Sequence, residues 1–383
     1  MRAVRCAAVL ALAAFVLGAG PATHAPHEGR SIVALPESER GNGAARAVDP
    51  VPSHVPTPVV RVRILEKHAP AWLDLDGPRR LLVRAAGDRL ALGGKLHDAI
   101  ELPAGAWRVR TDGLLRVYEG AVLLRAEAGA IAAWIEQPLE AYVADVVAAE
   151  SEPGTPAAAL EALAIVARSY ALAARERHAD GALCDLAHCQ VTAGRASAAA
   201  RRAAKATDGL VLARTVDGAV AQAPFHASCG GHTADPIATF GGPDHTGAAA
   251  VADPGCDAPW EATLPRALVD GAIASVLGTR ASATSLHVRP GAGGFVAEVA
   301  DPRSGRSATG EAFARALDRA AGWGTVRSPR FVVTPGDPVL IRGNGHGHGV
   351  GLCQSGAARR AAAGADARAI LAHYFPGARV ESL

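Results

Sequence analysis

The chain has 383 residues, of which 49% are hydrophobic and 20% are charged, and its formal net charge is +2. This composition can bury a core and build two or three domains, and it excludes a chain disordered throughout, a collagen-like repeat and a coiled coil. A net charge near zero argues against nucleic acid or an anionic membrane surface as partner. Arginine pairs such as Arg201–Arg202 and Arg359–Arg360 are interpreted as solvated surface.

The N-terminus is typical of an export signal. Arg2 and Arg5 precede an apolar run that ends at Leu17, and small residues follow, with candidate cleavage positions after Ala22 and Ala25. No other stretch approaches the ~20 apolar residues of a membrane span, so we expect no transmembrane helix in the mature chain. We therefore predict a signal peptide over residues 1–25 and an extracytoplasmic location, secreted or periplasmic.

Two segments of different pattern follow the signal. Residues 26–58 are rich in Pro, Gly, Ala and charged residues, which predicts a flexible linker. Residues 59–133 alternate short apolar runs with Gly, Pro and Asp turns, a pattern typical of a small antiparallel β segment. The expected strands lie at 60–64, 80–84, 107–110, 115–118 and 122–125.

The clearest helical pattern begins after Pro138, which suits a first helical position. Apolar residues then recur at helical spacing until just before Glu150, at Leu139, Tyr142, Val143, Val146 and Val147. Thr155 and Pro156 form a cap and first turn for a second apolar helix that is expected to run to about residue 177. The short Pro-Gly connection predicts a helical hairpin whose turn lies on an exposed rim.

Strands and helices are mixed beyond residue 210. We expect strands at 210–213, 220–225, 331–333 and 339–341, helices at 266–277 and 311–321, and a hairpin across 290–294. A Gly-rich loop over 343–351 then leads into C-terminal helices. The prediction is an α+β protein, with a mixed domain over 134–383 that contains the helical hairpin.

Glu150 is the most informative carboxylate in the sequence. It ends an apolar helix, where the negative end of the helix dipole disfavours a second negative charge, and partial burial would raise its pKa further. A carboxylic acid that keeps its proton near neutral pH can act as a general acid. The alternative is an ordinary surface glutamate, and Glu152 in the following turn is a competitor.

The segment FHASCGGHT at 225–233 follows a predicted strand. Its glycines, Gly230 and Gly231, would let the backbone approach a ligand closely, and His226 and Ser228 beside them could orient that ligand. The alternative is a tight turn with an incidental histidine.

The segment GHGHGVG at 345–351 places His346 and His348 two residues apart. In an extended backbone both side chains project from one face, within reach of one metal ion or one sugar. The segment lacks the helical HExxH pattern of a zinc hydrolase, so substrate-facing histidines are favoured over a metal pair.

Five cysteines remain once the signal is removed: Cys184, Cys189, Cys229, Cys256 and Cys353. An odd number in an oxidising compartment leaves at least one thiol free, metal-bound or bridged to another chain, and two disulfides are the simplest expectation. Cys184 and Cys189, together with His178, could supply three zinc ligands, or the two cysteines could form disulfides. The spacing leaves the pairing open.

In their order and spacing, these segments resemble the SpoIID/LytB family, the sporulation stage II protein D and amidase-enhancer-like proteins of bacterial cell walls. The resemblance extends from about residue 59 to the C-terminus. The matching segments are PLEAYVADVVAAE at 138–150, ALEALAIVARSYA at 159–171, CDLAHCQ at 184–190, FHASCGGHT at 225–233, FGG at 240–242, GHGHGVGLCQSGA at 345–357 and HYFPG at 373–377.

The resemblance implies a peptidoglycan lytic transglycosylase. Such enzymes cleave the MurNAc–GlcNAc bond of glycan strands, preferably strands stripped of stem peptides, and leave 1,6-anhydro-MurNAc ends. Glu150 then corresponds to the catalytic acid and base, and the chemistry requires no cofactor. The implied glycan-binding and supporting residues are His226, Ser228, Gly230, Gly231, His346, His348, Gln354, Arg168 and Tyr170.

The resemblance also implies a candidate structural zinc, because some members bind zinc near a His and two Cys, and this sequence keeps His178, Cys184 and Cys189. An N-acetylmuramoyl-L-alanine amidase is a candidate partner. The sequence departs from the family at Ser151, where Met is usual after the glutamate, and in three aromatic positions. Phe225 stands in place of Tyr, and Phe240 and His346 stand in place of Trp.

Two other functions remain open at this point. The same groove could belong to a wall-binding protein without catalytic activity that stimulates an amidase. Alternatively, His346 and His348 could hold the zinc of a hydrolase.

Overall fold

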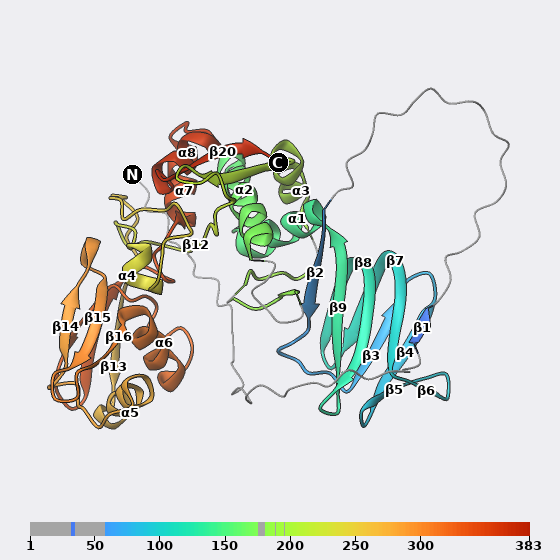
Figure 1. Cartoon of the computed structure of the whole chain (residues 1–383), viewed down its shortest axis with the longest axis horizontal. Coiled ribbons are helices and arrows are strands. Elements are labelled where there is room, and N and C mark those ends of the chain that lie inside the picture. The colour runs from blue at the N-terminus through green and yellow to red at the C-terminus, as the bar shows by residue number, and fades with distance from the viewer. Residues whose placement is uncertain (1–31, 35–57, 175–180, 188, 195) are drawn as a thin grey trace. The chain divides into compact units, whose positions relative to one another are not determined.

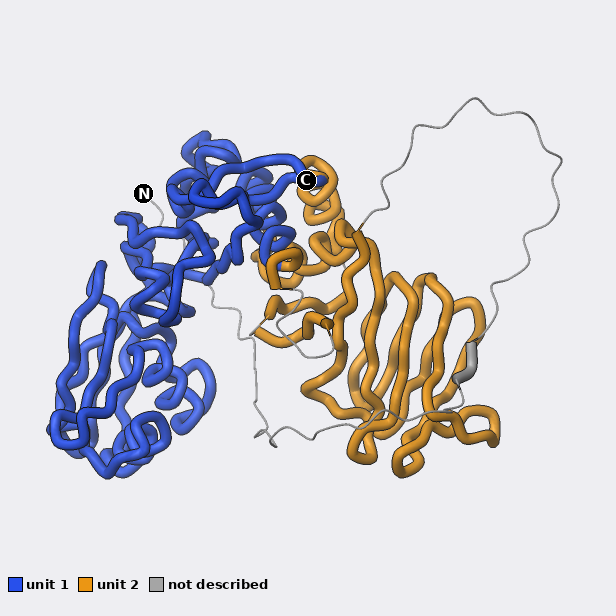
Figure 2. The backbone as a smooth tube through the Cα atoms, viewed as in Figure 1, with its two compact units in different colours: residues 1–16, 155–170, 209–383 blue, residues 17–154, 171–208 orange. Residues whose placement is uncertain are grey.

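The structure is a computed structural model, and it describes residues 32–34, 58–174, 181–187, 189–194 and 196–383. The chain forms two compact units (Figure 2). Unit 1 contains residues 155–170 and 209–383, and unit 2 contains the described residues before 155 together with those between 171 and 208. Helices and sheets are both abundant, which confirms the predicted α+β class. The predicted signal peptide lies outside the described residues.

Unit 2 is built on one large sheet (Figure 1). Its strands follow the order β10-β2-β9-β8-β7-β3-β4-β5-β6. Every pair of neighbours in this order from β2 onward to β6 is antiparallel. The strands are β2 (Val59–Ile64), β3 (Trp72–Asp76), β4 (Arg80–Ala86), β5 (Arg89–Leu92), β6 (Lys95–His97), β7 (Ala99–Thr111), β8 (Leu114–Glu127), β9 (Ala130–Pro138) and β10 (Leu183–Cys184). Every strand expected between residues 59 and 133 is present, with the last two merged into β8.

The alternating pattern of the sequence explains which face of the sheet is buried. In β2 the side chains of Val60, Val62 and Ile64 are almost completely buried, whereas Arg61 between them is exposed. This is the period of two that a half-buried strand requires. A short strand β1 (Ile32–Ala34) pairs in parallel with β7, so the predicted linker over 26–58 is not a linker throughout. The rest of that linker lies outside the described residues.

Helix α1 (Leu139–Glu150) and helix α3 (Ala198–Ala206) complete unit 2. The predicted apolar stripe of α1 is buried along its whole length, and the helix packs against α3, β9 and β2. Because these contacts join α1 to the sheet, the two units do not divide at the predicted domain boundary between residues 133 and 134. Helix α2 (Ala157–Ala173) begins next to the expected cap, and its predicted end near residue 177 lies outside the described residues.

Unit 1 contains four small sheets. The strands are β11 (Leu210–Arg214) with β20 (Ala378–Ser382), β12 (Phe225–His226) with β19 (Leu352–Cys353), β13 (Pro259–Leu264) with β18 (Val339–Asn344) and β17 (Phe331–Thr334), and β14 (His287–Pro290) with β15 (Val296–Asp301) and β16 (Arg306–Thr309). Its helices besides α2 are α4 (Pro236–Phe240), α5 (Arg266–Leu277), η1 (Ala292–Gly294), α6 (Gly310–Ala321), α7 (Gln354–Ala362) and α8 (Ala367–Tyr374).

The helices expected at 266–277 and 311–321 are confirmed as α5 and α6, which pack together over an apolar core that includes Ile273, Phe313 and Ile341. The expected strand at 220–225 is wrong in its length. Only β12 and an isolated bridge between Ala213 and Val220 form there, because Pro224 lacks the N–H that a strand interior needs. Within the described residues, no helix has both the length and the apolar character to cross a membrane.

Candidate functional site

Glu150 is the last residue of α1 in unit 2. Its side chain is half-buried, and its Oε1 accepts a hydrogen bond from the backbone N–H of Val191 at 2.9 Å. The helix ends there because Ser151 leaves the helical conformation and its side-chain hydroxyl donates to the carbonyl of Val147 at 2.6 Å. The carboxyl is therefore held by a defined donor rather than facing bulk solvent.

Burial raises the pKa of Glu150 from its ordinary value of 4.5 to about 7, although the hydrogen bond from Val191 acts in the opposite direction. Burial also raises the pKa values of Asp145 and Asp185 in the same unit to about 6. Of these three carboxyls Glu150 has the highest pKa, and both its protonated and its ionised form are populated near neutral pH. That is the property of a group that donates a proton and then accepts one.

The segment that follows β10 holds the partners of α1. The side chains of Cys184 and Cys189 are buried and hydrogen-bonded to each other, and the hydroxyl of Tyr142 on α1 donates to Oε1 of Gln190 at 3.0 Å. One residue further, Val191 donates to Glu150. Two of the three predicted zinc ligands therefore lie close together in a buried place. The third, His178, lies outside the described residues.

In unit 1 the two glycine-rich segments pair with each other. Ser228 N–H donates to the carbonyl of His346 at 3.1 Å, and His346 N–H donates to the carbonyl of Ser228 at 2.8 Å. Gly345 makes this approach feasible, because its φ is +98° and a Cβ there would lie 2.9 Å from the carbonyl oxygen of Ser228. Two motifs that are more than a hundred residues apart in the sequence thus form one structural element.

His226 and His348 lie next to each other in this element. Their ring centroids are 5.6 Å apart, and the ring of His348 also meets that of Phe240 at 5.2 Å. The Nδ1 of His226 lies 3.0 Å from the carbonyl of Val350, while the Nδ1 of His348 accepts from the N–H of Val350 at 3.0 Å. The Nε2 of His226 is buried and has no hydrogen-bond partner among the described residues.

The three histidines of this element, His226, His346 and His348, all favour the neutral imidazole. Burial lowers the pKa of His226 to about 3, with the charge of His348 acting in the same direction, and burial lowers that of His348 to about 4. For His346, which is half-buried, burial and then Arg327 lower the pKa. The only described group of three or more residues able to hold a metal ion lies elsewhere, so the structure gives no support to a zinc hydrolase built on His346 and His348.

The remaining predicted residues differ in how accessible they are. Gly230 and Gly231 both have positive φ angles, +66° and +105°, and Gln354 begins α7 with a half-buried side chain. Ser228 is buried. Arg168 is not a substrate-facing residue, because its side chain is completely buried and Nη1 donates to the carbonyl of Leu210 at 2.9 Å. Tyr170 is also buried, so both side chains support α2 from inside.

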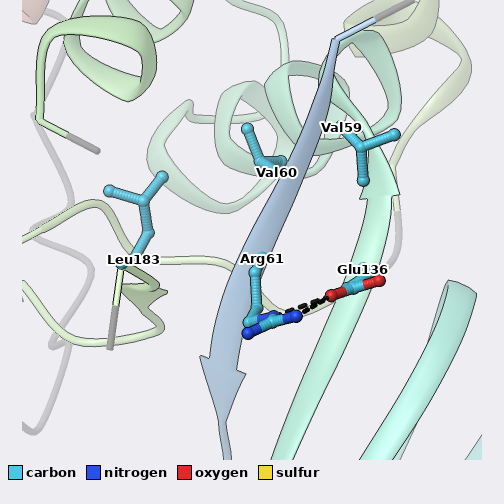
Figure 3. Close-up of a pocket in the computed structure, with 6 residues that line it drawn as sticks. Val59, Val60, Arg61, Glu136 and Leu183 are labelled. Carbon is cyan, nitrogen blue, oxygen red and sulfur yellow. Dashed lines mark hydrogen bonds and ion pairs between the residues drawn. The ribbon is translucent and has the colours of Figure 1, made fainter. Parts of the chain in front are cut away.

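One cavity in unit 2 is lined by none of these residues. It has a volume of about 360 Å³ and opens beside β2, where Arg61 and Glu136 form an ion pair (Figure 3). It is lined by Val59, Val60, Arg61, Glu136, Gly181 and Leu183. Because an exposed ion pair occupies its wall and none of the predicted site residues lines it, we do not assign the chemistry to this cavity.

Sequence reasoning missed two kinds of residue. Val191 acts through its backbone N–H, which leaves no signal in the residue type. Asp253 is completely buried and forms ion pairs with Arg359 and Arg360. Arg359 is exposed, as the interpretation of the arginine pair as solvated surface expects, whereas Arg360 is partly buried and does not fit that interpretation. The signal that could have identified Asp253 is its position three residues before Cys256 in a segment that carries an otherwise unexplained cysteine.

A comparison with protein families matches one part of the chain. Residues 127–213 match the family model SpoIID, described as Stage II sporulation protein. The match includes α1 with Glu150, α2, Cys184 and Cys189, and it ends before the glycine-rich segments of unit 1. No curated protein matches the chain. Residues 127–213 are therefore similar to the SpoIID family, whose description relates it to sporulation.

Proposed function

We propose that this protein is an extracytoplasmic lytic transglycosylase that cleaves the MurNAc–GlcNAc bonds of peptidoglycan glycan strands, with Glu150 as the acid and base. The observation that carries the proposal is the state of Glu150. It ends the apolar helix α1 inside the family match, and burial raises its pKa to about 7. A surface glutamate at a helix end would not keep its proton at that pH.

The proposed reaction needs one carboxyl group. Protonated Glu150 donates its proton to the glycosidic oxygen as the bond to C1 of MurNAc breaks, and the C6 hydroxyl of the same sugar forms the new bond to C1. The ionised Glu150 then takes the proton of that hydroxyl, which restores the acid and yields the 1,6-anhydro end. Because the nucleophile belongs to the substrate, no second carboxylate has to activate water, unlike in ordinary glycoside hydrolysis.

The glycine-rich element of unit 1 is the proposed glycan-binding surface. Neutral imidazoles, hydroxyls and amides form hydrogen bonds with sugar hydroxyls, and His226, His346, His348, Ser228 and Gln354 provide these groups. Gly230 and Gly231 have positive φ angles, which favour glycine, and they bring no side-chain bulk to this element.

No cofactor takes part in this chemistry. A zinc ion held by Cys184 and Cys189, with His178 as the third ligand, would stabilise the segment that carries Val191. In that position the metal supplies structure and takes no part in proton transfer. An N-acetylmuramoyl-L-alanine amidase that removes stem peptides is the partner we propose.

The test is the digestion of purified, peptide-free glycan strands with product analysis by mass spectrometry. The wild-type protein is expected to release fragments with 1,6-anhydro-MurNAc ends. Glu150→Gln is expected to lower the rate at least about a hundred-fold, because general acid–base catalysis contributes about 10²–10⁴. The matched control is Glu152→Gln, the same substitution at an exposed position two residues further along, which should keep the wild-type rate.

Two outcomes would contradict the proposal. If Glu150→Gln cleaves as fast as the wild type, Glu150 is not the acid. If neither protein cleaves glycan but both accelerate an amidase acting on intact peptidoglycan, the protein is an amidase enhancer instead.

A further inference from the structure

A second cluster of potential metal ligands lies in unit 1, separate from Cys184 and Cys189. Cys229, Cys256, Cys353 and Asp253 are all buried, and their sulfur and carboxylate oxygen atoms lie within 4.8 Å of one another. The Sγ atoms of Cys256 and Cys353 are 3.2 Å apart, and Sγ of Cys229 lies 3.5 Å from Oδ2 of Asp253. All three cysteines are free thiols.

Three separate parts of the chain bring these four side chains together. Cys229 follows β12, Cys353 ends β19, and these two strands pair in parallel with His226 opposite Cys353. Asp253 and Cys256 lie in the connection before β13, and the N–H of Asp253 donates to the carbonyl of Gly231 at 2.9 Å. The backbone therefore fixes the positions of the four donors independently of any bond between them.

Two backbone N–H groups point at the sulfur of Cys353. Its Sγ accepts from the N–H of Cys229 and from the N–H of Gly356, both at 3.3 Å, and it caps the N-terminus of α7. A helix N-terminus and backbone N–H groups directed at a sulfur stabilise negative charge on it. The Sγ of Cys256 lies 3.4 Å from the hydroxyl oxygen of Ser228, within hydrogen-bonding distance.

The charges around Asp253 complete the site. Its Oδ1 forms ion pairs with Arg359 and with Arg360, at 2.5 and 3.1 Å, and its Oδ2 accepts from the hydroxyl of Tyr374 at 2.7 Å. Three thiolates and one carboxylate carry four negative charges, of which the two guanidinium groups neutralise two. A divalent cation would neutralise the other two, which a buried site requires.

We propose that Cys229, Cys256, Cys353 and Asp253 form a tetrahedral binding site for a thiophilic divalent cation of the Zn²⁺ class. A Zn–S bond of about 2.3 Å in a tetrahedron separates the sulfurs by about 3.8 Å, which these donor atoms reach with small shifts. Three sulfurs and one oxygen fill four positions, so the site is closed and structural. The metal would join the segment that contains Ser228 to the segment that contains Gln354. It would therefore fix the shape of the proposed glycan-binding surface.

A disulfide between two of the three cysteines is the competing arrangement. It would use two sulfurs and leave the third thiol beside Asp253 and the two arginines. The metal site gives every one of the four donors a ligand role, and the N–H groups that point at Cys353 suit a metal-bound thiolate better than a neutral disulfide.

The experiment removes the other cysteines and uses cobalt as a spectroscopic substitute for zinc. The full chain carrying Cys6→Ser, Cys184→Ala and Cys189→Ala keeps only the three clustered cysteines. Purified without reductant, stripped with a chelator and titrated with Co²⁺, it should bind about one ion per chain and show sulfur-to-cobalt charge-transfer absorption. Adding Cys256→Asp, which replaces one thiolate by another ligand, should lower that absorption by about one third.

The same chain distinguishes the competing arrangement by thiol counting. In denaturant with a chelator, all three thiols should react with a maleimide before any reductant is added. One reactive thiol before reduction and three after it would show a disulfide and overturn the proposal, and so would the absence of cobalt absorption. If the alanine variants do not fold, zinc content in the otherwise unchanged chain decides. Cys256→Ser should contain one equivalent of zinc less than the wild type, and an unchanged zinc content would overturn the proposal. None of these measurements depends on glycan cleavage.

Discussion

Glu150 couples the stability of the protein to pH in an unusual direction. Its pKa is about 7 in the folded state and 4.5 as its ordinary value, so the folded state binds the proton more tightly. This stabilising contribution is complete below about pH 4.5 and is lost as the pH rises through 7. Most carboxyls that form ion pairs act in the opposite direction, losing their contribution as the pH falls.

Glu150→Gln should therefore stabilise the protein at alkaline pH and leave it almost unchanged in acid. Glutamine keeps an oxygen acceptor for the N–H of Val191 and never ionises. One pKa unit corresponds to about 1.4 kcal/mol, and partial exposure reduces the effect, so we expect the free energy of unfolding to rise by about 1–3 kcal/mol at pH 8. Urea unfolding at pH 4 and at pH 8 measures the difference.

Glu152→Gln is again the matched control, because the side chain is exposed. It should change the free energy of unfolding by less than about 0.5 kcal/mol at either pH. Equal stability of wild type and Glu150→Gln at pH 8 would show that the carboxyl of Glu150 is not desolvated, and the proposed acid would lose its physical basis.

The wild-type rate of glycan cleavage should also fall as the pH rises above about 7. Above the pKa of Glu150 its carboxyl group is ionised and can no longer donate a proton. The measurement is the initial rate of anhydro-MurNAc release between pH 5 and 9. A rate that stays constant up to pH 9 would indicate that the acid is a group with a higher pKa.

At the level of the helices, α7 and α5 offer a comparison of two glycine substitutions. A Cβ at Gly356 in α7 would lie 2.0 Å from Oδ2 of Asp253 and 2.1 Å from the hydroxyl of Tyr374, whereas a Cβ at Gly271 in α5 would meet nothing within 4 Å. Gly356→Ala should destabilise the protein by about 1–3 kcal/mol through overpacking. Gly271→Ala should stabilise it by about 0.5–1 kcal/mol, because alanine favours the helix.

Thermal unfolding of both variants measures this difference. The prediction is that the two variants change the stability in opposite directions, although the chemical change is the same in both. A Gly356→Ala variant as stable as the wild type would show that α7 does not approach Asp253 closely, and the geometry of the proposed metal site would be wrong.

The sequence predicted the helices and strands well where the apolar pattern is regular. The stripe of α1 and the alternation of β2 each identify an element and the face that it buries, because both depend on local periodicity. The prediction of a strand over 220–225 was wrong in its length. It followed the apolar composition of the segment and gave too little weight to Pro224. The pairing of Ser228 with His346 is a long-range contact that no local pattern contains.

At the level of the whole molecule, the family resemblance predicts Glu150 and the glycine-rich segments as site residues, but the arrangement of the cysteines needed coordinates. Spacing along the chain gave no reason to group Cys229 with Cys353, because residues far apart in sequence meet only when the chain has folded. The same holds for Arg359 and Arg360, whose partner Asp253 lies more than a hundred residues earlier.

The parallel pairing of β12 with β19 has a consequence for how the protein acquires its shape. Each strand has two residues, and Phe225 and His226 pair with Leu352 and Cys353. Closing so long an intervening segment costs entropy before the contacts formed can compensate, and such topologies fold slowly. During synthesis His226 has no strand partner until Leu352 and Cys353 have also been made. Any activity that depends on His226 in this pairing thus requires a chain that extends at least to Cys353.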